Sequence, residues 1–502
     1  MTAEIHYFPT KLFKGFLYKN EPEVVVDSIW AVFNKPYIPI ILQIKDSHKF
    51  PIYIHKLEIA ISSENKTTTH TIEINQKFSS IYECKIFYIN IENFIYTLFS
   101  LNPTSQKQFF KLKIKAKIYA SINGKDISFI NTNIVRNPKN IEIYYILEDY
   151  PRISEFYSID FHVHSNFTED FVEFGASVEC YDKIKNFIDL DYFVITDHSY
   201  DLDDRIGEFF SKTATFEKWE KLKELNSKVK SMILSEELSV GNSKNQNVHL
   251  IILDENLEKP YIGKGDGGEE LFRNKPNIYL IDIKSKIKIA AHPTEKIPFA
   301  HKILLNRGNY SFNELLNEVD GIEFLNRFPW LTFEKDIKIL DKILQEKLKN
   351  KKEPPFLVAG NDSHGYFSIG YYIKMPLFKI STNKSHLFGR NRTFIKEFRN
   401  FNELINNLRS SSFSTGGFIT IDKENLKIYA KSSNFFGNIK YLILKEITTE
   451  KINTYTFKFN HLEIDVDIKE KLTFYSSFPI FVYAILITNK NNISISNIIE
   501  IN

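Results

Sequence analysis

Residues 157–164 read YSIDFHVH, an apolar run that ends in two histidines separated by one residue. A short run of this kind predicts a buried β-strand. Side chains two positions apart on a strand point to the same face, so His162 and His164 can bind one metal ion together. This stretch therefore predicts a strand that carries metal ligands at its carboxyl end.

The region around this strand alternates short apolar runs with stretches of helical period. The helical stretches are residues 177–189, 215–231 and 333–348, and Ser177 and Thr215 are placed to cap two of them. The predicted strands are residues 157–163, 192–196, 232–234, 248–253, 287–291, 321–325 and 356–359. Such alternation predicts an α/β fold, either a β/α barrel or a layered sheet.

Period-two alternation dominates the chain on both sides of this region. In residues 110–118, Phe, Leu, Ile and Ala alternate with Lys, and a turn at Asn123-Gly124 follows, which predicts a β-hairpin. Strand-like runs return after about Ile419. We therefore expect an N-terminal β-sandwich domain over 1–150, a β/α domain over 151–420 and a C-terminal β-domain over 421–502.

Composition limits the classes of partner and compartment. The 65 Lys and Arg nearly balance the 62 Asp and Glu, so neither a nucleic acid nor a membrane surface is indicated. No stretch has the apolar core of a signal peptide or a membrane span. Cys84 and Cys180 form no CxxC pattern, so neither a disulfide framework nor a structural zinc site is indicated. We expect a soluble, cytoplasmic protein, and the oligomeric state stays open.

Residue types that bind metals follow nearly every predicted strand of the middle region. The segments are Asp160–His164, Thr196–His198, Glu236-Glu237, Ala291–Pro293 and Asn361–His364. In a parallel barrel the carboxyl ends of the strands converge on one rim, where such residues would meet. Each motif alone is more often incidental, and His249 lies inside an apolar strand. Together, however, they contain most of the histidines of the region, which favours a metal site.

The residue types also indicate the metal and the reaction. Imidazole and carboxylate ligands suit zinc, manganese or iron, whereas an all-oxygen site would suit magnesium or calcium. Two or three ions that share a bridging carboxylate can hold a water as hydroxide near neutral pH and clamp a transferring phosphoryl group. We therefore expect a hydrolase with two or three divalent ions and no separate nucleophile.

In their order along the chain, the motifs HxH, TDH, a Glu, two single His and a final DxH resemble the PHP family, the polymerase and histidinol phosphatase domain. The resemblance covers about Ser158 to Gly417. It implies a distorted (β/α)7 barrel with a trinuclear metal site at the carboxyl ends of the strands. Residues 389–393 (GRNRT) and 414–418 (STGGF) look like the CehA/McbA-like branch, which often carries β-domains and includes a carbamate-ester hydrolase.

Carried over residue by residue, the resemblance implies a ligand set for each ion. The first ion would be held by His162, His164, Glu237 and Asp362. Glu237 would bridge to a second ion held by His249 and His292. The third would take His198, His364 and a residue shortly after HxH, for which Glu169 and Asp170 compete and we favour Asp170.

The resemblance also separates the residues by role. Glu237, Asp362 and His364 are the residues that we expect to carry catalysis through the ions they hold. Asp160 and Asp197 are expected to orient imidazoles rather than to bind ions directly. Arg390 and Arg392 could contact an anionic substrate, and a purely structural role for each is an equal alternative.

Three functions remain open at the level of the sequence. The leading hypothesis is a phosphoesterase that acts on a small-molecule phosphate ester through a metal-bound hydroxide. A carboxylester or carbamate hydrolase would use the same hydroxide on a carbonyl carbon. The third is a metal-stabilised scaffold whose β-domains bind a polysaccharide or a protein, although a scaffold has no need of an open multinuclear site.

Overall fold

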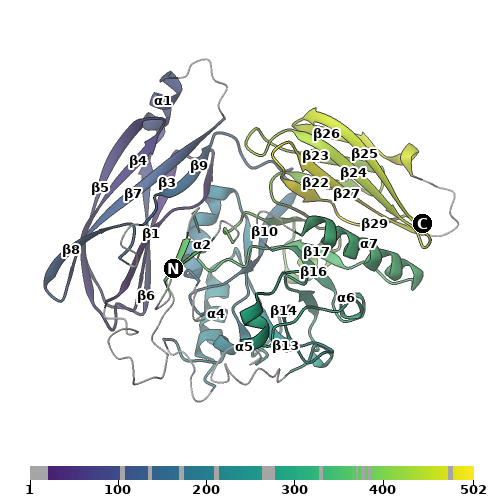
Figure 1. Cartoon of the computed structure of the whole chain (residues 1–502), viewed down its shortest axis with the longest axis horizontal. Helices are drawn as coiled ribbons and strands as arrows, with labels where there is room; N and C mark the ends of the chain where they lie inside the picture. The colour runs from purple at the N-terminus through teal and green to yellow at the C-terminus, as the bar shows by residue number, and fades with distance from the viewer. Residues whose placement is uncertain are drawn as a thin grey trace. The chain divides into compact units, whose positions relative to one another are not determined.

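The computed structural model describes residues 21–101, 108–133, 138–168, 175–207, 214–262, 278–326, 332–365, 367–368, 371–374, 379–382, 386–472 and 479–501. The chain divides into two compact units (Figure 1). The first consists of Met1–Asp149, His164–Asp189 and Ser363–Phe388, and the second of Tyr150–Val163, Leu190–Asp362 and Gly389–Asn502. The division falls inside both the HxH and the DxH motif.

Two sheets make up most of the first unit. One has the order β1-β3-β6, with β1 (Glu23–Asp27), β3 (Tyr37–Lys45) and β6 (Tyr82–Asn90). The other has the order β2-β9-β7-β4-β5, and β8 pairs with β7. Its strands are β2 (Ala31–Phe33), β4 (Ile52–Ser63), β5 (Lys66–Phe78), β7 (Phe109–Ile122), β8 (Lys125–Ile130) and β9 (Ile141–Ile146). This arrangement is consistent with the predicted β-sandwich.

The period-two pattern determines which side of β7 is buried. Leu112, Ile114 and Ala116 are fully buried, while the lysines between them are exposed. The turn after β7 has positive φ at Asn123 (51°) and Gly124 (76°), as a two-residue hairpin turn of this type requires. The predicted hairpin is therefore confirmed.

The remaining elements of the first unit are short. They are α1 (Glu92–Leu101), α2 (Val178–Ile184), the 3-10 helix η2 (Lys185–Ile188) and the strand pair β18 (Tyr371–Lys374) and β19 (Lys379–Thr382). Ser177 caps α2, since its side chain accepts a hydrogen bond from the Cys180 backbone N–H at 3.2 Å. The cap predicted at Ser177 is thus confirmed, whereas helix α4 (Glu217–Lys228) of the second unit follows Phe216 and not Thr215.

The described residues of the second unit form three sheets. The largest has the order β12-β11-β10-β20-β21-β28-β27-β24-β25, and β29 pairs with β27. Its strands are β10 (Phe156–Val163), β11 (Tyr192–Ile195), β12 (Met232–Leu234), β20 (Arg392–Lys396), β21 (Ser412–Ser414), β24 (Ile439–Ile447), β25 (Ile452–His461), β27 (Ile480–Thr488), β28 (Ile493–Ile495) and β29 (Ile499–Ile501). This sheet therefore includes strands from both the predicted barrel region and the C-terminal region.

The other two sheets are smaller. One has the order β13-β14-β15-β16-β17, with β13 (Glu236–Gly241), β14 (Asn247–Leu253), β15 (Ile287–Ala290), β16 (Gly321–Leu325) and β17 (Phe356–Ala359). The other joins β22 (Phe418–Asp422), β23 (Lys427–Lys431) and β26 (Glu463–Asp467). Residues of β22, β23 and β26 share a buried apolar cluster with residues of β24 and β27, as in a β-sandwich.

The predicted (β/α)7 barrel is wrong, although strands lie at all seven predicted positions. Among these seven strands, parallel pairing is confined to β10-β11-β12 in one sheet and β15-β16-β17 in another. The other edge of β10 pairs antiparallel with β20, and β14 pairs antiparallel with both β13 and β15. These antiparallel neighbours replace the single closed ring of parallel strands that a barrel requires.

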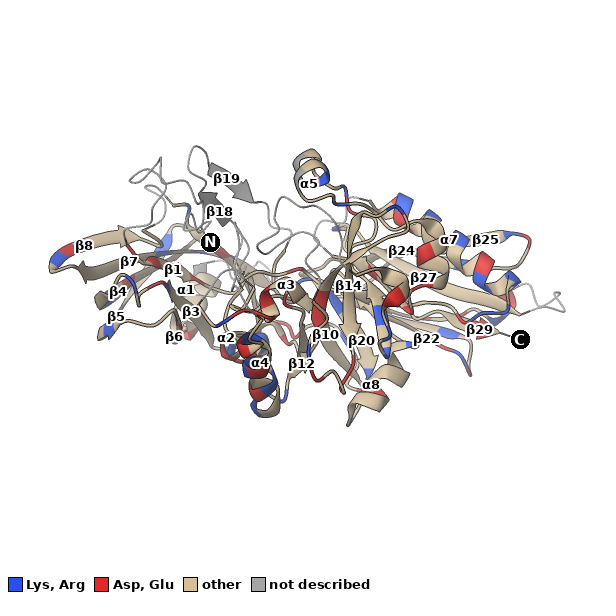
Figure 2. Cartoon of the chain, turned by 90° about the horizontal axis from the view of Figure 1, so that it is seen from below, with Lys and Arg blue, Asp and Glu red and all other residues tan. Residues whose placement is uncertain are grey.

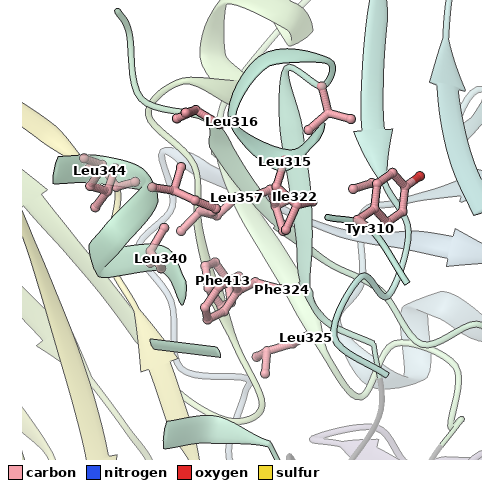
Figure 3. Close-up of a cluster of buried hydrophobic side chains, with 14 of the residues drawn as sticks. Tyr310, Leu315, Leu316, Ile322, Phe324, Leu325, Leu340, Leu344, Leu357 and Phe413 are labelled. Carbon is pink, nitrogen blue, oxygen red and sulfur yellow. The ribbon is translucent and has the colours of Figure 1, made fainter. Parts of the chain in front are cut away.

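Helix α7 (Phe333–Lys349) packs against the five-stranded sheet through an apolar stripe (Figure 3). Leu340 and Leu344 of α7 face Ile322 and Phe324 of β16 and Leu357 of β17 in the same buried cluster. Because side chains alternate along a strand, Glu323 points to the opposite face of β16 from its two apolar neighbours. The core thus fixes the strand that presents Glu323 to the metal-ligand cluster described below.

The other helices of the second unit are α3 (Ser199–Leu202), α5 (Phe299–Leu304), α6 (Phe312–Asn317) and α8 (Phe401–Leu408). Acidic and basic residues are interspersed along helices such as α4 and α7 (Figure 2), in keeping with the balanced composition. Among the described residues, no helix is both long enough and apolar enough to cross a membrane.

Candidate metal centre

Glu237 on β13 is the centre of a buried cluster in the second unit. Its Oε2 lies 3.1 Å from His198 Nδ1 and 3.4 Å from His162 Nε2. Its Oε1 lies 2.6 Å from His249 Nδ1 and 3.0 Å from His292 Nε2. The glutamate is fully buried, so each carboxylate oxygen contacts two imidazoles away from solvent.

Strand pairing brings three of these side chains together. The Glu237 backbone N–H donates to the Asp197 carbonyl at 3.0 Å, which pairs the segment after β11 with β13 and delivers His198. His249 lies on β14, the antiparallel partner of β13. The ligand atoms of His198, Glu237 and His249 lie within 4.8 Å of one another, so this group could hold one metal ion.

His162 joins the cluster from the end of β10 and has acidic groups on both ring nitrogens. Its Nε2 faces Glu237 and also Asp362, whose Oδ1 is 3.5 Å away. Its Nδ1 lies 3.1 Å from both oxygens of Glu323. The pKa of His162 is raised well above its ordinary value: burial lowers it, but Glu323, Glu237 and Asp362 together raise it further. This corner of the site thus favours positive charge.

The backbone is unusual at two cluster residues. His292, just after β15, has φ of 30°, and Asp362, after β17, has φ of 50°. Residues other than glycine seldom adopt the left-handed region, and such conformations gather at functional sites. Tight packing accompanies them, because a Cβ added at Gly360 would lie 2.4 Å from the His162 Cβ and 2.7 Å from Glu323 Oε1.

His164 and His364 lie in the first unit. Their rings stack with centroids 4.0 Å apart, and the His164 backbone N–H donates to the Ser363 carbonyl at 2.9 Å. His164 Nδ1 lies 3.2 Å from the Thr168 hydroxyl, and the Tyr181 hydroxyl donates to the His164 carbonyl at 2.9 Å. The two motifs thus also supply a buried histidine pair.

The structure groups the predicted ligands as follows. His162, His198, Glu237, His249, His292 and Asp362 come together in the second unit, and His164 and His364 in the first. Glu169 and Asp170 lie outside the described residues. Metal binding by each residue, and the catalytic role of Glu237, Asp362 and His364, stay predictions.

Sequence reasoning missed Glu323 and assigned its role to Asp160. Glu323 contacts the His162 ring and accepts hydrogen bonds from the His292 backbone N–H at 2.9 Å and from Asn326 Nδ2 at 3.0 Å. Asp160 accepts from the backbone N–H groups of His162, Asn361 and Gly389, at 3.3, 3.1 and 2.8 Å, and its expected role in orienting an imidazole stays a prediction. A buried glutamate within the apolar run GIEFL was the signal that could have identified Glu323.

The two arginines considered for substrate binding have structural contacts. The Arg392 guanidinium is fully buried, donates to the Gly389 carbonyl and lies 3.7 Å from the centre of the Tyr150 ring. Arg390 donates to Asn492 Oδ1 at 3.0 Å and lies over the Phe436 ring. These contacts favour the structural alternative for both arginines.

A small cavity adjoins the cluster. Its wall includes His249 and His292 together with Arg307, Glu295 and Tyr310. The Tyr310 hydroxyl donates to the His249 carbonyl at 2.5 Å, and the Gly308 backbone N–H donates to the Asn247 carbonyl at 2.9 Å. The loop that carries Arg307 is therefore attached to β14, the strand of His249.

The comparisons with known proteins identify no family. No family model and no curated protein matches the chain. A solved structure of a putative late embryogenesis abundant protein is 13% identical, with a TM-score of 0.20, and the match covers 25% of this chain and 71% of that one. A protein from Archaeoglobus fulgidus is 11% identical, with a TM-score of 0.14 and coverage of 24% and 94%. TM-scores this low support no conclusion about fold or function.

Proposed function

We propose that this chain is a metal-dependent hydrolase whose active site is the cluster around Glu237. The observation that carries the proposal is the position of Glu237, with two imidazoles at each carboxylate oxygen. A carboxylate that bridges two ions has this environment, with nitrogen ligands on both sides.

The donor set fits a transition metal better than magnesium or calcium. Imidazole nitrogens outnumber carboxylates around Glu237, and such mixed sites suit zinc, manganese or iron. Tetrahedral ligands about 2.0–2.1 Å from zinc would be roughly 3.3 Å apart. The separations of 2.6 to 3.4 Å at Glu237 are close to that value. Two or three ions per chain remain the expectation.

The chain's own residues would have distinct roles in hydrolysis. When divalent ions are bound, they supply a water of lowered pKa and neutralise charge on the substrate. Glu237 would hold the ions at a fixed separation, and Glu323 would keep the His162 ring in place through Nδ1. The Arg307 side chain on the cavity wall carries a permanent positive charge that suits an anionic group.

Two observations support a small phosphate ester as the substrate. The motif order resembles the PHP family, although without its barrel the argument rests on the site and not on the fold. Arg307 on the wall of the cavity beside the cluster carries a positive charge that would attract the anionic group of such an ester. A carboxylester or carbamate is the alternative that the same residues would serve.

Substrate panels on metal-loaded protein test the proposal. Protein stripped with a chelator would be reloaded with zinc, manganese or iron, then assayed on p-nitrophenyl phosphate, its diester, p-nitrophenyl acetate and an aryl carbamate. We expect metal-dependent release from a phosphate ester. Turnover of the acetate or carbamate alone would reassign the substrate class, and bound metal without turnover of any compound would support the scaffold alternative.

A further inference from the structure

The first unit brings together the two cysteines, which are far apart in the sequence. Cys84 lies on β6 and Cys180 on α2, both as thiols, and the two side chains interact with each other. Cys180 is buried, with 2% of its surface exposed, and Cys84 is partly exposed. The sequence spacing gave no sign of this pair, which forms only because α2 packs on β6.

Contacts on both sides of the pair hold α2 and its continuation against β6. The Ser177 backbone N–H donates to the Tyr82 hydroxyl at 3.4 Å, and the Tyr88 ring stacks on Phe187 at 5.7 Å between centroids. Tyr82 and Tyr88 flank Cys84 on the strand, while Ser177 and Phe187 flank Cys180. The two thiols are thus held close together from both directions.

We propose that Cys84 and Cys180 are a redox-active thiol pair that forms a reversible disulfide when the protein meets a peroxide. The partly exposed Cys84 sulfur attacks one peroxide oxygen, which gives a sulfenic acid and releases the other oxygen as water. The Cys180 sulfur then attacks the Cys84 sulfur, forming the disulfide and releasing a second water. The two thiols lose two electrons in total, which reduce the peroxide, and a dithiol reductant reverses the change.

The disulfide would join β6 to α2, a helix that contacts two segments with predicted metal ligands. Tyr181, next to Cys180, donates to the His164 carbonyl and accepts from the Gly365 backbone N–H, both at 2.9 Å. Ser165 also pairs with Ala176, just before α2. Oxidation would therefore fix the helix that contacts the backbone of both the His164 and the His364 segments.

Burial affects the order and rate of the two steps. Burial, with a smaller effect from Cys84, raises the pKa of the Cys180 thiol well above its usual range. Since the thiolate is the nucleophile, the second step is slow at neutral pH. The sulfenic acid at Cys84 should therefore persist long enough to be trapped by dimedone.

Thiol counting and intact mass on the full chain test the proposal. Reduced protein, freed of reductant and treated with a small excess of hydrogen peroxide, should lose both thiols, and its mass should fall by two hydrogen atoms. A peptide map should show Cys84 linked to Cys180, and dithiothreitol should restore both thiols. The disulfide closes a long loop, so the oxidised protein should also melt at a higher temperature than the reduced protein.

Two single variants separate the steps. Cys180→Ser should stop at the dimedone-reactive sulfenic acid on Cys84, whereas Cys84→Ser should leave Cys180 as a thiol. Three results in peroxide-treated wild-type protein would each overturn the proposal. Both thiols could remain, Cys84 could be overoxidised beside an intact Cys180 thiol, or disulfides could form only between chains. The wild-type measurements decide the matter even if a variant misfolds, and they require neither metal nor hydrolysis.

Discussion

Glu236 and Glu237 are adjacent buried carboxylates with different surroundings. Glu237 faces four imidazoles, whereas Glu236 accepts a hydrogen bond from the Tyr261 backbone N–H at 2.9 Å. Burial raises the pKa of Glu236 to about 8, so it is largely protonated at neutral pH. The charged member of the pair is therefore expected to be Glu237, the one directed at the cluster.

A matched pair of substitutions tests this difference. Glu237→Gln keeps the size of the side chain but removes the charge and one acceptor oxygen, so we expect loss of most of the bound metal and of hydrolysis. Glu236→Gln replaces a largely neutral acid with a neutral amide and should leave the metal content unchanged. Elemental analysis of both variants after identical reloading checks this, and equal metal loss in the two would contradict the assignment.

Glu323 provides a second prediction at the scale of the residue. Its carboxylate contacts the His162 ring and the His292 backbone, and the change Glu323→Gln would weaken both contacts. Loss of a group that orients a ligand typically costs about 10- to 100-fold in metal affinity or activity. We therefore expect a metal dissociation constant raised by roughly that factor, measured by competition with a chromophoric chelator. Complete loss of metal would instead make Glu323 a direct ligand.

At the scale of the element, β16 and β17 determine the position of the metal-ligand cluster. Gly360, just after β17, has no space for a Cβ beside His162 and Glu323. Gly321 at the start of β16 is equally crowded, but there the added Cβ would meet the Phe356 ring at 2.2 Å. An alanine at either glycine would therefore clash with its neighbours, but only the clash at Gly360 involves residues of the metal-ligand cluster.

The change at each glycine to alanine should separate stability from metal binding. Overpacking of this kind costs about 1–3 kcal/mol, so both variants should be less stable to urea. Gly360→Ala should also reduce metal affinity, because His162 and Glu323 must move, whereas Gly321→Ala should retain it. The comparison fails if both variants bind metal like the wild type, or if both lose it.

The sequence predicted which segments form strands better than it predicted which strands pair with one another. Each predicted apolar run from residue 157 to 359 forms a strand, because the spacing of apolar residues is a local property of the sequence. The pairing of β10 with β20 joins segments more than 200 residues apart, and nothing in either segment specifies an antiparallel neighbour. Strand β13 was missed because Glu236 and Glu237 were interpreted as residues that follow the preceding strand. Glu323 was missed because an acid within a predicted strand, although a signal, belonged to none of the motifs.

At the scale of the whole molecule, stability should depend on pH through Asp27 in the first unit. Burial, opposed by hydrogen bonds from Ser368 and Ser28, raises the pKa of Asp27 from 3.8 to about 6. The folded state thus holds this proton more tightly than the unfolded state does. Its contribution to stability is full below about pH 3.8 and is lost as the pH rises through 6.

Asp27→Asn should remove that dependence. At about 1.4 kcal/mol per pKa unit, the variant should gain up to about 3 kcal/mol over the wild type above pH 6, and little at pH 4. Urea unfolding at several pH values measures the difference, with Asp126→Asn, whose side chain is 88% exposed, as the control for loss of a carboxylate. A difference that does not change with pH would show that Asp27 does not titrate in this range.

Anomalous diffraction from crystals of zinc-loaded protein tests the central claim most directly. Data collected above and below the zinc absorption edge would locate bound ions without any assumption about the reaction. We predict an anomalous peak about 2.0–2.2 Å from a Glu237 oxygen and from a ring nitrogen of His198 or His249, which disappears in Glu237→Gln crystals. Loaded protein with no peak beside Glu237, or an equally strong peak there in the variant, would contradict the account.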